Sequence, residues 1–190
     1  MALVLASSSP QRRAILAQVG IPFEVVVSGV DEVEHGDPVA VAEENARRKA
    51  LAVAGEAARD GARRLVLGAD TLVAVDGDIL GKPADADQAR EYVARLAGRT
   101  HEVVGAIAVV RDGALAHVTS EITQVHFREA GPELLDWYVA TGEWEGRAGG
   151  YAIQGAGAVL VAGIEGDYLN VVGLPLQRLI DLVPELLPTR

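Results

Sequence analysis

Residues 65–83 read LVLGADTLVAVDGDILGKP, and the rest of the chain can be organised around this stretch. The apolar run at 65–67 is typical of a buried strand, and the pattern continues through residues 71–75. Asp76-Gly77 is among the strongest hairpin signals that a sequence offers, because both residues tolerate the positive φ angles of a tight turn. The stretch therefore predicts a long strand that turns back on itself.

The predicted turn also sets which side chains meet. Val75 faces Asp78, and counting outward places Thr71 opposite Lys82, so that Asp70 lies next to this lysine. Two interpretations remain open for the pair. It is either a surface ion pair at the base of a hairpin, or a functional pair in which Asp70 binds a metal or accepts a proton while Lys82 binds phosphate.

The composition indicates a soluble globular chain. Its 190 residues are 49% hydrophobic, which is enough apolar material for one domain over residues 1–190. The formal net charge of −10 disfavours non-specific binding to nucleic acids and anionic membranes. The sequence has no cysteine and only four scattered histidines, which excludes disulfides, thiolate metal sites and zinc-ligand spacings. With no signal peptide and no bilayer-spanning run, we expect a cytoplasmic protein.

The first predicted helix carries basic residues where acidic ones are usually found. Ser9 can cap the helix and Pro10 can be its first residue, so Arg12 and Arg13 fall in the first turn. Cations there oppose the helix dipole unless an anion is bound. Hydroxyl groups, free backbone N–H groups and two guanidinium groups would then converge on a phosphate. The alternative is that both arginines lie in solvent.

Two further segments carry charged residues whose roles stay open. The loop at 29–37 is acidic, and it is either simply solvated or the source of a second metal-binding carboxylate. The following helix at 39–54 is expected to end at Gly55 and has an apolar face on which Lys49 lies. A lysine in this position either extends to solvent or points into a cleft.

The remaining chain alternates between helices and strands, without repeats or linkers. We predict strands at 3–6 and 23–28, a helix at 85–97, strands at 100–110, 114–119 and 121–127, a helix at 132–140, paired strands at 158–164 and 168–172, and a final helix at 176–187. This interleaving favours an α/β or α+β fold with a mixed sheet.

A glycine-rich loop, GRAGGYAIQGAG, covers residues 146–157. It has neither the strand–GxGxxG–helix order of a dinucleotide site nor the GxxxxGK[ST] pattern of a P-loop, so its glycines most simply serve turns. Gln154 within it offers both a donor and an acceptor, which suits recognition of a base edge.

Together these features are typical of a metal-assisted phosphoanhydride hydrolase. Cationic side chains and backbone N–H groups would hold a polyphosphate, one or two carboxylates would hold Mg²⁺, and Asp70 would orient or deprotonate a water molecule. No Ser-His-Asp or Cys-His arrangement is indicated, which disfavours covalent catalysis.

The sequence resembles the Maf family of nucleoside triphosphate pyrophosphatases over almost its whole length, from LVLASSSPQRR to Pro175. The matching motifs follow one another in order: Ser7-x-Ser9-Pro10 with Arg12-Arg13, Asp31-Glu32, Lys49-Ala50, Gly68-Ala69-Asp70-Thr71, Gly81-Lys82-Pro83, Gly98-Arg99-Thr100-His101, Ala148-Gly149-x-Tyr151-x-Ile153-Gln154-Gly155 and Val172-Gly173-Leu174-Pro175.

This resemblance implies hydrolysis of a nucleoside triphosphate between its α and β phosphates, with a divalent cation, Mg²⁺ or alternatively Mn²⁺. It implies a two-lobed α/β fold with a central cleft, similar to that of the inosine triphosphate pyrophosphatases. Asp70 matches the proton acceptor of the family, and Glu32 joins it at the metal site. Six residues match the phosphate-binding side of the family: Ser7, Ser9, Arg12, Arg13, Lys49 and Lys82. Of these, Lys82 is also expected to take part in catalysis.

Within the family, GADT and YxIQG resemble the branch that prefers dTTP and UTP, which places Thr71 and Gln154 near the nucleobase. Many members of that branch have Arg at the position of Gln11, a position linked to base selection. Gln11 can still hydrogen-bond a pyrimidine edge, without the positive charge. Modified pyrimidine nucleotides are further expected substrates. Two alternatives remain: a pyrophosphatase for 7-methyl-GTP, and a nucleotide-binding regulator of septum formation that needs no turnover.

The expected partner is a small-molecule nucleoside triphosphate, with no nucleic acid and no membrane. Three aromatic residues either form the interface of a homodimer or are core or partly exposed residues, as such aromatic residues more often are: Trp137, Tyr138 and Trp144. The sequence leaves the oligomeric state open.

Overall fold

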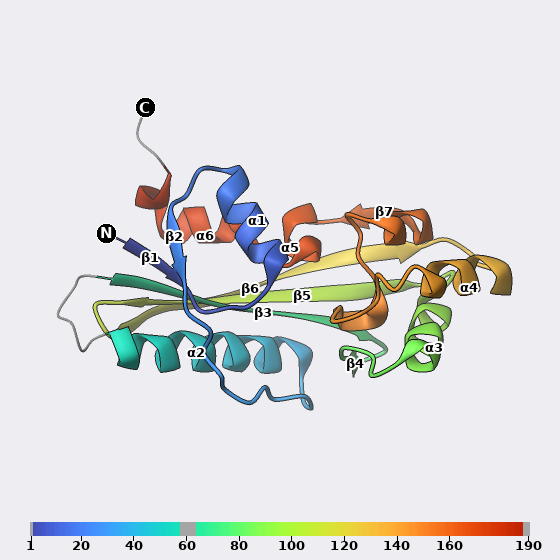
Figure 1. Cartoon of the computed structure of the whole chain (residues 1–190), viewed down its shortest axis with the longest axis horizontal. Helices are drawn as coiled ribbons and strands as arrows, with labels where there is room; N and C mark the ends of the chain where they lie inside the picture. The colour runs from blue at the N-terminus through green and yellow to red at the C-terminus, as the bar shows by residue number, and fades with distance from the viewer. Residues whose placement is uncertain (1, 58–63, 188–190) are drawn as a thin grey trace.

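The computed structural model describes residues 2–57 and 64–187, which build one mixed sheet flanked by helices (Figure 1). The sheet runs in the order β2-β1-β3-β5-β6-β7, with β4 paired to β3. β1, β2 and β3 are parallel and the other pairings are antiparallel, so the predicted mixed sheet is confirmed. The seven strands are β1 (Ala2–Leu5), β2 (Phe23–Val25), β3 (Arg64–Val75), β4 (Asp78–Leu80), β5 (Thr100–Arg111), β6 (Ala114–Phe127) and β7 (Val161–Glu165).

The helices divide between the two faces of the sheet. Figure 1 shows α2 along one face, with α1, α5 and α6 on the opposite face and α3 and α4 toward the far end. The α-helices are α1 (Pro10–Gln18), α2 (Pro38–Ala57), α3 (Ala86–Leu96), α4 (Pro132–Ala140), α5 (Tyr168–Val172) and α6 (Leu176–Leu182). Short 3-10 helices lie at η2 (Ala148–Gly150), η3 (Ala156–Leu160) and η4 (Pro184–Leu186).

The alternating side chains of β3 pack against helices on both faces of the sheet. Leu65, Leu67 and Ala69 pack in the core under α1 and α6. Val66 lies in the core that α2 covers. Because successive side chains of a strand point to opposite faces, each face of β3 receives its own helix. This alternation continues into the functional part of the strand.

The predicted hairpin forms, with Val75 facing Asp78 and the ladder running back to Val73 and Leu80. Both turn residues have positive φ angles, as the sequence pattern requires. β4 ends at Leu80, however, so the predicted pairing of Thr71 with Lys82 is wrong. The chain leaves the sheet at Gly81, whose carbonyl accepts a hydrogen bond from the backbone N–H of Gly149 (3.0 Å) in η2.

This early end of β4 opens the sheet beside the middle of β3. β1 pairs with residues 64–67 of β3 and β4 pairs with residues 73–75. β5 occupies the other edge along almost the whole strand, so β1 and β4 share the remaining edge. Residues 68–72 therefore have no strand beside them on that edge, and Asp70 and Thr71 lie in the gap.

The C-terminal part differs most from the sequence prediction. Residues 168–172, predicted as a strand, form helix α5, and β7 pairs with β6 instead. The reason is local: the Asp167 side chain caps the helix by accepting from Leu169 N (2.8 Å), and a short, mainly apolar segment fits either structure. The predicted final helix ends at Leu182, since Pro184 cannot donate the next helical hydrogen bond.

Three other predicted boundaries of strands and helices also differ from the structure. The two strands predicted at 114–119 and 121–127 form the single strand β6, which pairs with β5 along its length. The strand predicted at 23–28 is limited to β2. Helix α2 continues past Gly55 to Ala57, so this glycine does not end it.

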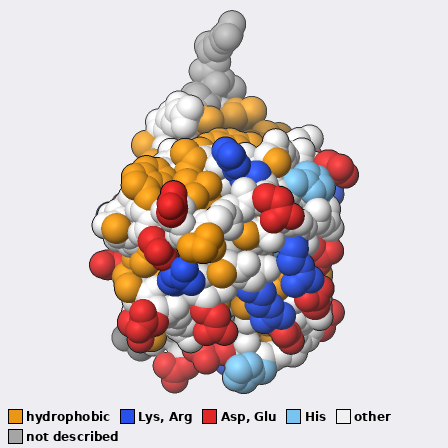
Figure 2. Space-filling model, turned by 90° about the vertical axis from the view of Figure 1, so that its right-hand side faces the viewer, with side chains coloured by type: hydrophobic (Ala, Val, Ile, Leu, Met, Phe, Trp, Pro, Cys, Tyr) orange, Lys and Arg blue, Asp and Glu red, His pale blue; other side chains and the backbone are white. Residues whose placement is uncertain are grey.

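The surface agrees with the acidic composition. Figure 2 shows Asp and Glu side chains spread over one end of the molecule, with Lys and Arg among them and hydrophobic side chains gathered in its upper part. Of the three aromatic residues considered for an interface, Trp137 is 49% exposed and Tyr138 is fully buried. In the described part of the chain, the helices are too short or too polar to span a bilayer.

Candidate active site

A cavity of about 950 Å³ opens at the gap beside residues 68–72. Its lining comes from the end of β1, the start of α1, the loop at 29–37, one face of α2, the middle of β3, the exit of β4 and the glycine-rich loop. The predicted site residues that line it are Ser7, Ser9, Gln11, Arg12, Glu32, Lys49, Asp70, Thr71, Lys82 and Gln154. Arg13 is exposed and lies outside this lining.

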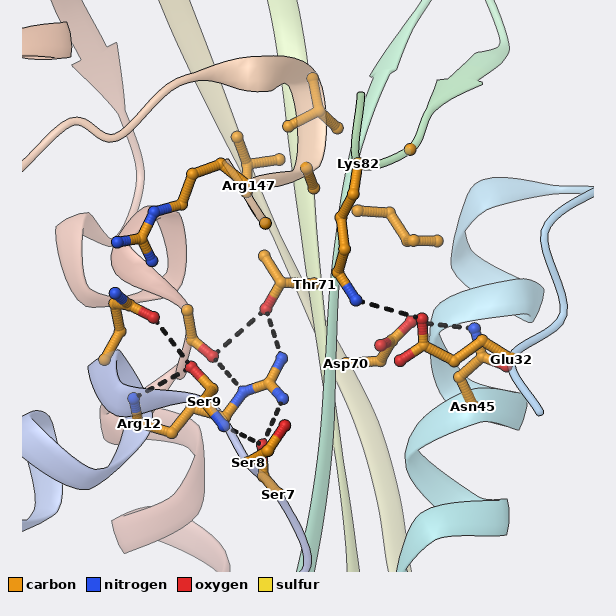
Figure 3. A pocket seen from close by; sticks show the side chains of 18 of the residues that line it. Ser7, Ser8, Ser9, Arg12, Glu32, Asn45, Asp70, Thr71, Lys82 and Arg147 are labelled. Atoms are coloured by element: carbon orange, nitrogen blue, oxygen red, sulfur yellow. Dashed lines mark hydrogen bonds and ion pairs between the residues drawn. The ribbon is translucent and has the colours of Figure 1, made fainter. Parts of the chain in front are cut away.

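Asp70 and Thr71 divide the cavity into two walls. Because neighbouring residues of a strand face opposite ways, Thr71 points toward Arg12 and Asp70 toward Asn45 and Glu32 (Figure 3). We call the first side, formed by Ser7, Ser9, Arg12, Thr71 and Gly173, the arginine wall. We call the second side, formed by Glu32, Asn45, Lys49, Asp70 and Lys82, the carboxylate wall.

The arginine wall begins with the predicted helix cap. The Ser9 side chain accepts a hydrogen bond from Arg12 N (3.4 Å), and Pro10 is the first residue of α1. The Ser9 hydroxyl also donates to Gln11 Oε1 (3.1 Å), and Ser9 N donates to Ser7 Oγ (3.2 Å). The predicted Ser9 cap and Pro10 helix start are therefore formed, and both Ser7 and Ser9 line the cavity.

Arg12 is buried, with only 8% of its surface exposed. Its guanidinium donates to Ser7 Oγ (2.9 Å), Thr71 Oγ1 (3.1 Å) and the Gly173 carbonyl (2.9 Å). Among the residues that the structure describes, no carboxylate forms an ion pair with it. Burial lowers the pKa of Arg12, and the more distant charges of Asp70 and Glu32 only oppose this shift. An anion in the cavity would supply the missing negative charge.

The carboxylate wall carries two acids joined by one ammonium group. Lys49 Nζ contacts Asp70 Oδ1 at 2.7 Å and Glu32 Oε1 at 2.5 Å. Lys82 Nζ lies 3.4 Å from Glu32 Oε2. Lys49 therefore points into the cleft, and it takes the place beside Asp70 that the hairpin register assigns to Lys82. The expectation that Lys82 pairs directly with Asp70 is wrong.

The two lysines also set the ionisation of Glu32. Burial opposes the charged form of this carboxylate, but the hydrogen bond and charge of Lys49, with help from Lys82, outweigh burial and lower its pKa. The acidic loop at 29–37 is thus part of the site and is held against α2.

A close approach of α2 to β3 brings the carboxylate wall together. A Cβ atom on Gly68 would collide with the backbone of Ala46 and Ala50. Only a glycine allows the helix to pack so near the strand. Residues Asn45 and Lys49, one helical turn apart, then both reach Asp70.

The carboxylates fit a divalent cation that is shared with a substrate. Among residues 2–57 and 64–187, no group of three or more His, Asp or Glu side chains could hold a metal ion alone. Glu32 and Asp70 nevertheless contact the same ammonium group, so a small cation in this region would meet oxygen donors from both. Mg²⁺ is commonly held by one or two carboxylates together with substrate phosphates.

Two polar residues of the site were missed by sequence reasoning. Asn45 is 1% exposed and donates to Asp70 Oδ2 (3.0 Å). Arg147 reaches into the cavity from the glycine-rich loop, and its Nε is buried without a partner among the described residues (Figure 3). An arginine within a glycine-rich loop was a usable signal for the second residue. The role of Asn45 depends on the approach of α2, which no sequence pattern reveals.

The glycine-rich loop presents Gln154 at the mouth of the cavity, where it is exposed. The Glu143 carboxylate fixes the loop by accepting from Ala156 N (2.9 Å) and Gly157 N (2.8 Å). Behind it, Tyr151 lines the cavity and its hydroxyl contacts buried His101 Nε2 at 2.8 Å. The loop is therefore held from behind while Gln154 stays available.

Comparison with known proteins adds an independent finding. A family model described as Maf-like protein matches residues 2–186. The chain is 50% identical to a dTTP/UTP pyrophosphatase from Symbiobacterium thermophilum, covering 96% of this chain and 93% of that protein. It is 43% identical to a dTTP/UTP pyrophosphatase from Pyrococcus furiosus, and the match covers 95% of this chain and 93% of that protein. Among solved structures, a HAM1 protein from Coxiella burnetii gives a TM-score of 0.48 at 16% sequence identity. This match covers 97% of this chain and 99% of the HAM1 chain.

Proposed function

This chain belongs to the Maf family, and we propose that it is a nucleoside triphosphate pyrophosphatase that hydrolyses dTTP and UTP to the monophosphate and pyrophosphate. The observation that carries the proposal is the pairing of the two walls in one cavity: a buried arginine that forms no ion pair with a described residue lies opposite two carboxylates. Relatives that carry the name dTTP/UTP pyrophosphatase support the substrate class. Because nucleoside triphosphates are present in the cytoplasm, the protein is proposed to act there.

In this proposal the arginine wall holds the phosphate chain. Arg12 and the hydroxyl groups of Ser7 and Ser9 offer donors to phosphate oxygens at the start of α1. Lys49 and Lys82 contribute positive charge from the opposite wall. The exposed Arg13 is assigned no contact.

Three lining residues are proposed to contact the nucleobase. Gln11, Thr71 and Gln154 each carry hydrogen-bonding groups and come from α1, β3 and the glycine-rich loop around the cavity. Gln11 and Gln154 can each offer a donor and an acceptor to a pyrimidine edge. A modified pyrimidine that keeps this edge would be accepted in the same way.

Asp70 is the proposed proton acceptor. A water molecule attacks phosphorus, the anhydride bond between the α and β phosphates breaks, pyrophosphate leaves and the proton of the water passes to the carboxylate. Asp70 Oδ1 and Oδ2 each accept one hydrogen bond, from Lys49 and Asn45. Each carboxylate oxygen has two acceptor positions, so one remains on each for the water.

Glu32 and Asp70 are the residues proposed to hold a divalent cation, most simply Mg²⁺. Such an ion would neutralise phosphate charge when bound. Lys49 binds both acids in the structure, so its ammonium group and the cation compete for the same oxygen atoms. Glu32→Gln should raise the Mg²⁺ concentration needed for half-maximal activity and should leave nucleotide binding without metal nearly unchanged.

The test is release of pyrophosphate from folded protein with Mg²⁺ across dTTP, UTP, CTP, GTP, ITP, 7-methyl-GTP and modified pyrimidine triphosphates. Preference for dTTP and UTP with the monophosphate as co-product is the expected result. Preference for 7-methyl-GTP would keep the chemistry and overturn the assignment of the base pocket. Tight nucleotide binding without turnover, with every metal tried, would contradict the enzyme proposal and favour a regulatory nucleotide-binding protein.

A further inference from the structure

We propose that Asn45 is a positioning residue that holds Asp70 and the acidic loop at 29–37 in their working geometry. The inference rests on the proposed role of Asp70 and adds a residue to it. Asn45 is 1% exposed and lies on α2, one helical turn before Lys49. A buried amide in an apolar helix face is costly unless its hydrogen bonds are made.

The amide of Asn45 makes three hydrogen bonds that join three parts of the chain. Its Oδ1 accepts from Val33 N (2.7 Å), and its Nδ2 donates to the Val33 carbonyl (3.0 Å) and to Asp70 Oδ2 (3.0 Å). The reversed amide would bring its oxygen against the Val33 carbonyl and the Asp70 carboxylate. These neighbours therefore fix which way the amide points.

Asn45 and Lys49 act as two parallel connections between α2, β3 and the loop. Lys49 binds Asp70 Oδ1 and Glu32, while Asn45 binds Asp70 Oδ2 and the next loop residue, Val33. Both oxygens of Asp70 and two successive loop residues are thus held by one face of the helix. The orientation of the carboxylate and the position of Glu32 are set together.

The two connections differ in what they can do during turnover. Lys49 is charged and faces the cavity, so phosphate oxygens compete with the carboxylates for its ammonium group. Asn45 is neutral, and both of its N–H donors are already used within the protein. Asn45 is therefore the connection that keeps Asp70 oriented when Lys49 turns to the substrate.

The matched control is Asn170, a second buried asparagine that does not itself line the cavity. Asn170 is fully buried, and its Nδ2 makes three hydrogen bonds, to the Val103 carbonyl (3.0 Å), the Glu121 carbonyl (3.2 Å) and Thr123 Oγ1 (3.1 Å). Asn45→Ala and Asn170→Ala therefore remove the same group and the same number of contacts. Both should lower the melting temperature.

The experiment measures kcat and KM for dTTP at saturating Mg²⁺, together with hydrogen exchange of a peptide that covers residues 29–37. Asn45→Ala should lower kcat by about 10- to 100-fold with little change in KM, and should speed exchange in this peptide. Asn170→Ala should keep kcat and the exchange of this peptide. Equal losses of kcat in both variants, or a normal kcat in Asn45→Ala, would overturn the inference.

A third variant separates the two contacts. Asn45→Asp keeps an acceptor for Val33 N but cannot donate to Asp70, so it should keep more exchange protection than Asn45→Ala and still lose kcat. Full kcat in Asn45→Asp would show that the contact with Asp70 is unimportant. A wild-type chain that turns over no nucleotide would instead overturn the proposed function, while the exchange result would still decide whether Asn45 holds the loop.

Discussion

The two walls of the cavity both contain basic side chains, but they balance this charge in different ways. On the arginine wall, Arg12 is surrounded by two hydroxyl groups and a carbonyl, none of which carries a negative charge. On the carboxylate wall, Lys49 and Lys82 meet Asp70 and Glu32. The arginine wall therefore carries a positive charge that its own residues do not balance, whereas the charges on the carboxylate wall nearly cancel.

This difference assigns separate tasks to the two walls. An uncompensated buried guanidinium is stabilised by an incoming anion, which suits binding of phosphate. Paired carboxylates and lysines suit chemistry, because carboxylates can hold a cation or accept a proton. Strand β3 joins the tasks, since Asp70 and Thr71 are neighbours that face opposite walls.

The largest effect is expected for Asp70→Asn, which removes the proposed proton acceptor and keeps the shape of the side chain. We predict a loss of kcat of about 10³-fold, because general base catalysis typically contributes this much. Steady-state pyrophosphate release with dTTP measures it. A variant that turns over dTTP like the parent would mean that the carboxylate wall does not carry the chemistry.

Arg12→Met tests the arginine wall. Loss of a charged hydrogen-bond donor costs about 1.5–3 kcal/mol, so kcat/KM should fall roughly 10- to 100-fold, mostly through KM. Arg13→Met is the control, since Arg13 neighbours Arg12 in sequence but is exposed outside the cavity lining. If the two variants raised KM equally, the contrast between the buried and the exposed arginine would fail.

Lys82→Ala should have a smaller effect, because the Lys82 side chain is 57% exposed and acts partly through water. We predict a loss of kcat/KM of about tenfold from removing a cation near the transition state. Arg90→Ala provides the control, as its exposed ion pair with Asp136 lies outside the cavity lining. An unchanged kcat/KM in Lys82→Ala would place this lysine outside the carboxylate wall.

The smallest effect on turnover is expected for His101, which lies behind the cavity and belongs to neither wall. Burial, with help from His126, lowers the pKa of His101 to about 4 from the usual 6.5. The unfolded chain therefore binds this proton more readily between these pH values, so stability is complete above pH 6.5 and falls as the pH drops toward 4.

The size of this loss is about 3 kcal/mol for a shift of this extent. His101→Gln should flatten the decline in melting temperature between pH 6.5 and 4, and His117→Gln, at an exposed site, should not. Thermal melts across this pH range measure the difference. The same slope in both variants would mean that His101 is not the group responsible.

Local signals made much of the fold predictable. The Ser9 cap and the Asp76-Gly77 turn each depend on a few neighbouring residues, and both form as expected. The segment at 168–172 was predicted wrongly because a short, mainly apolar segment fits a strand or a helix, and the capping contact of Asp167 decided between them.

The site was predictable in its residues but not in its pairings. Ten of the eleven expected residues line the cavity. Some, such as Arg12 and Lys49, stood out as charges in unusual helix positions, whereas others, such as Ser7 and Thr71, followed from the motifs of the family. The partner of Asp70 is Lys49 instead of Lys82, since the close packing of α2 at Gly68 decides the contact. Asn45 was missed for the same reason: its partners lie on other elements.

The most direct test of the two-wall division is calorimetric titration with the α,β-methylene analogue of dTTP in the presence of Mg²⁺. This analogue cannot be cleaved between its α and β phosphates, so it reports binding alone. We predict that Asp70→Asn binds it about as tightly as the wild type although turnover is lost, and that Arg12→Met binds it much more weakly. Tight binding by Arg12→Met, together with loss of binding in Asp70→Asn, would contradict the assignment of the two walls.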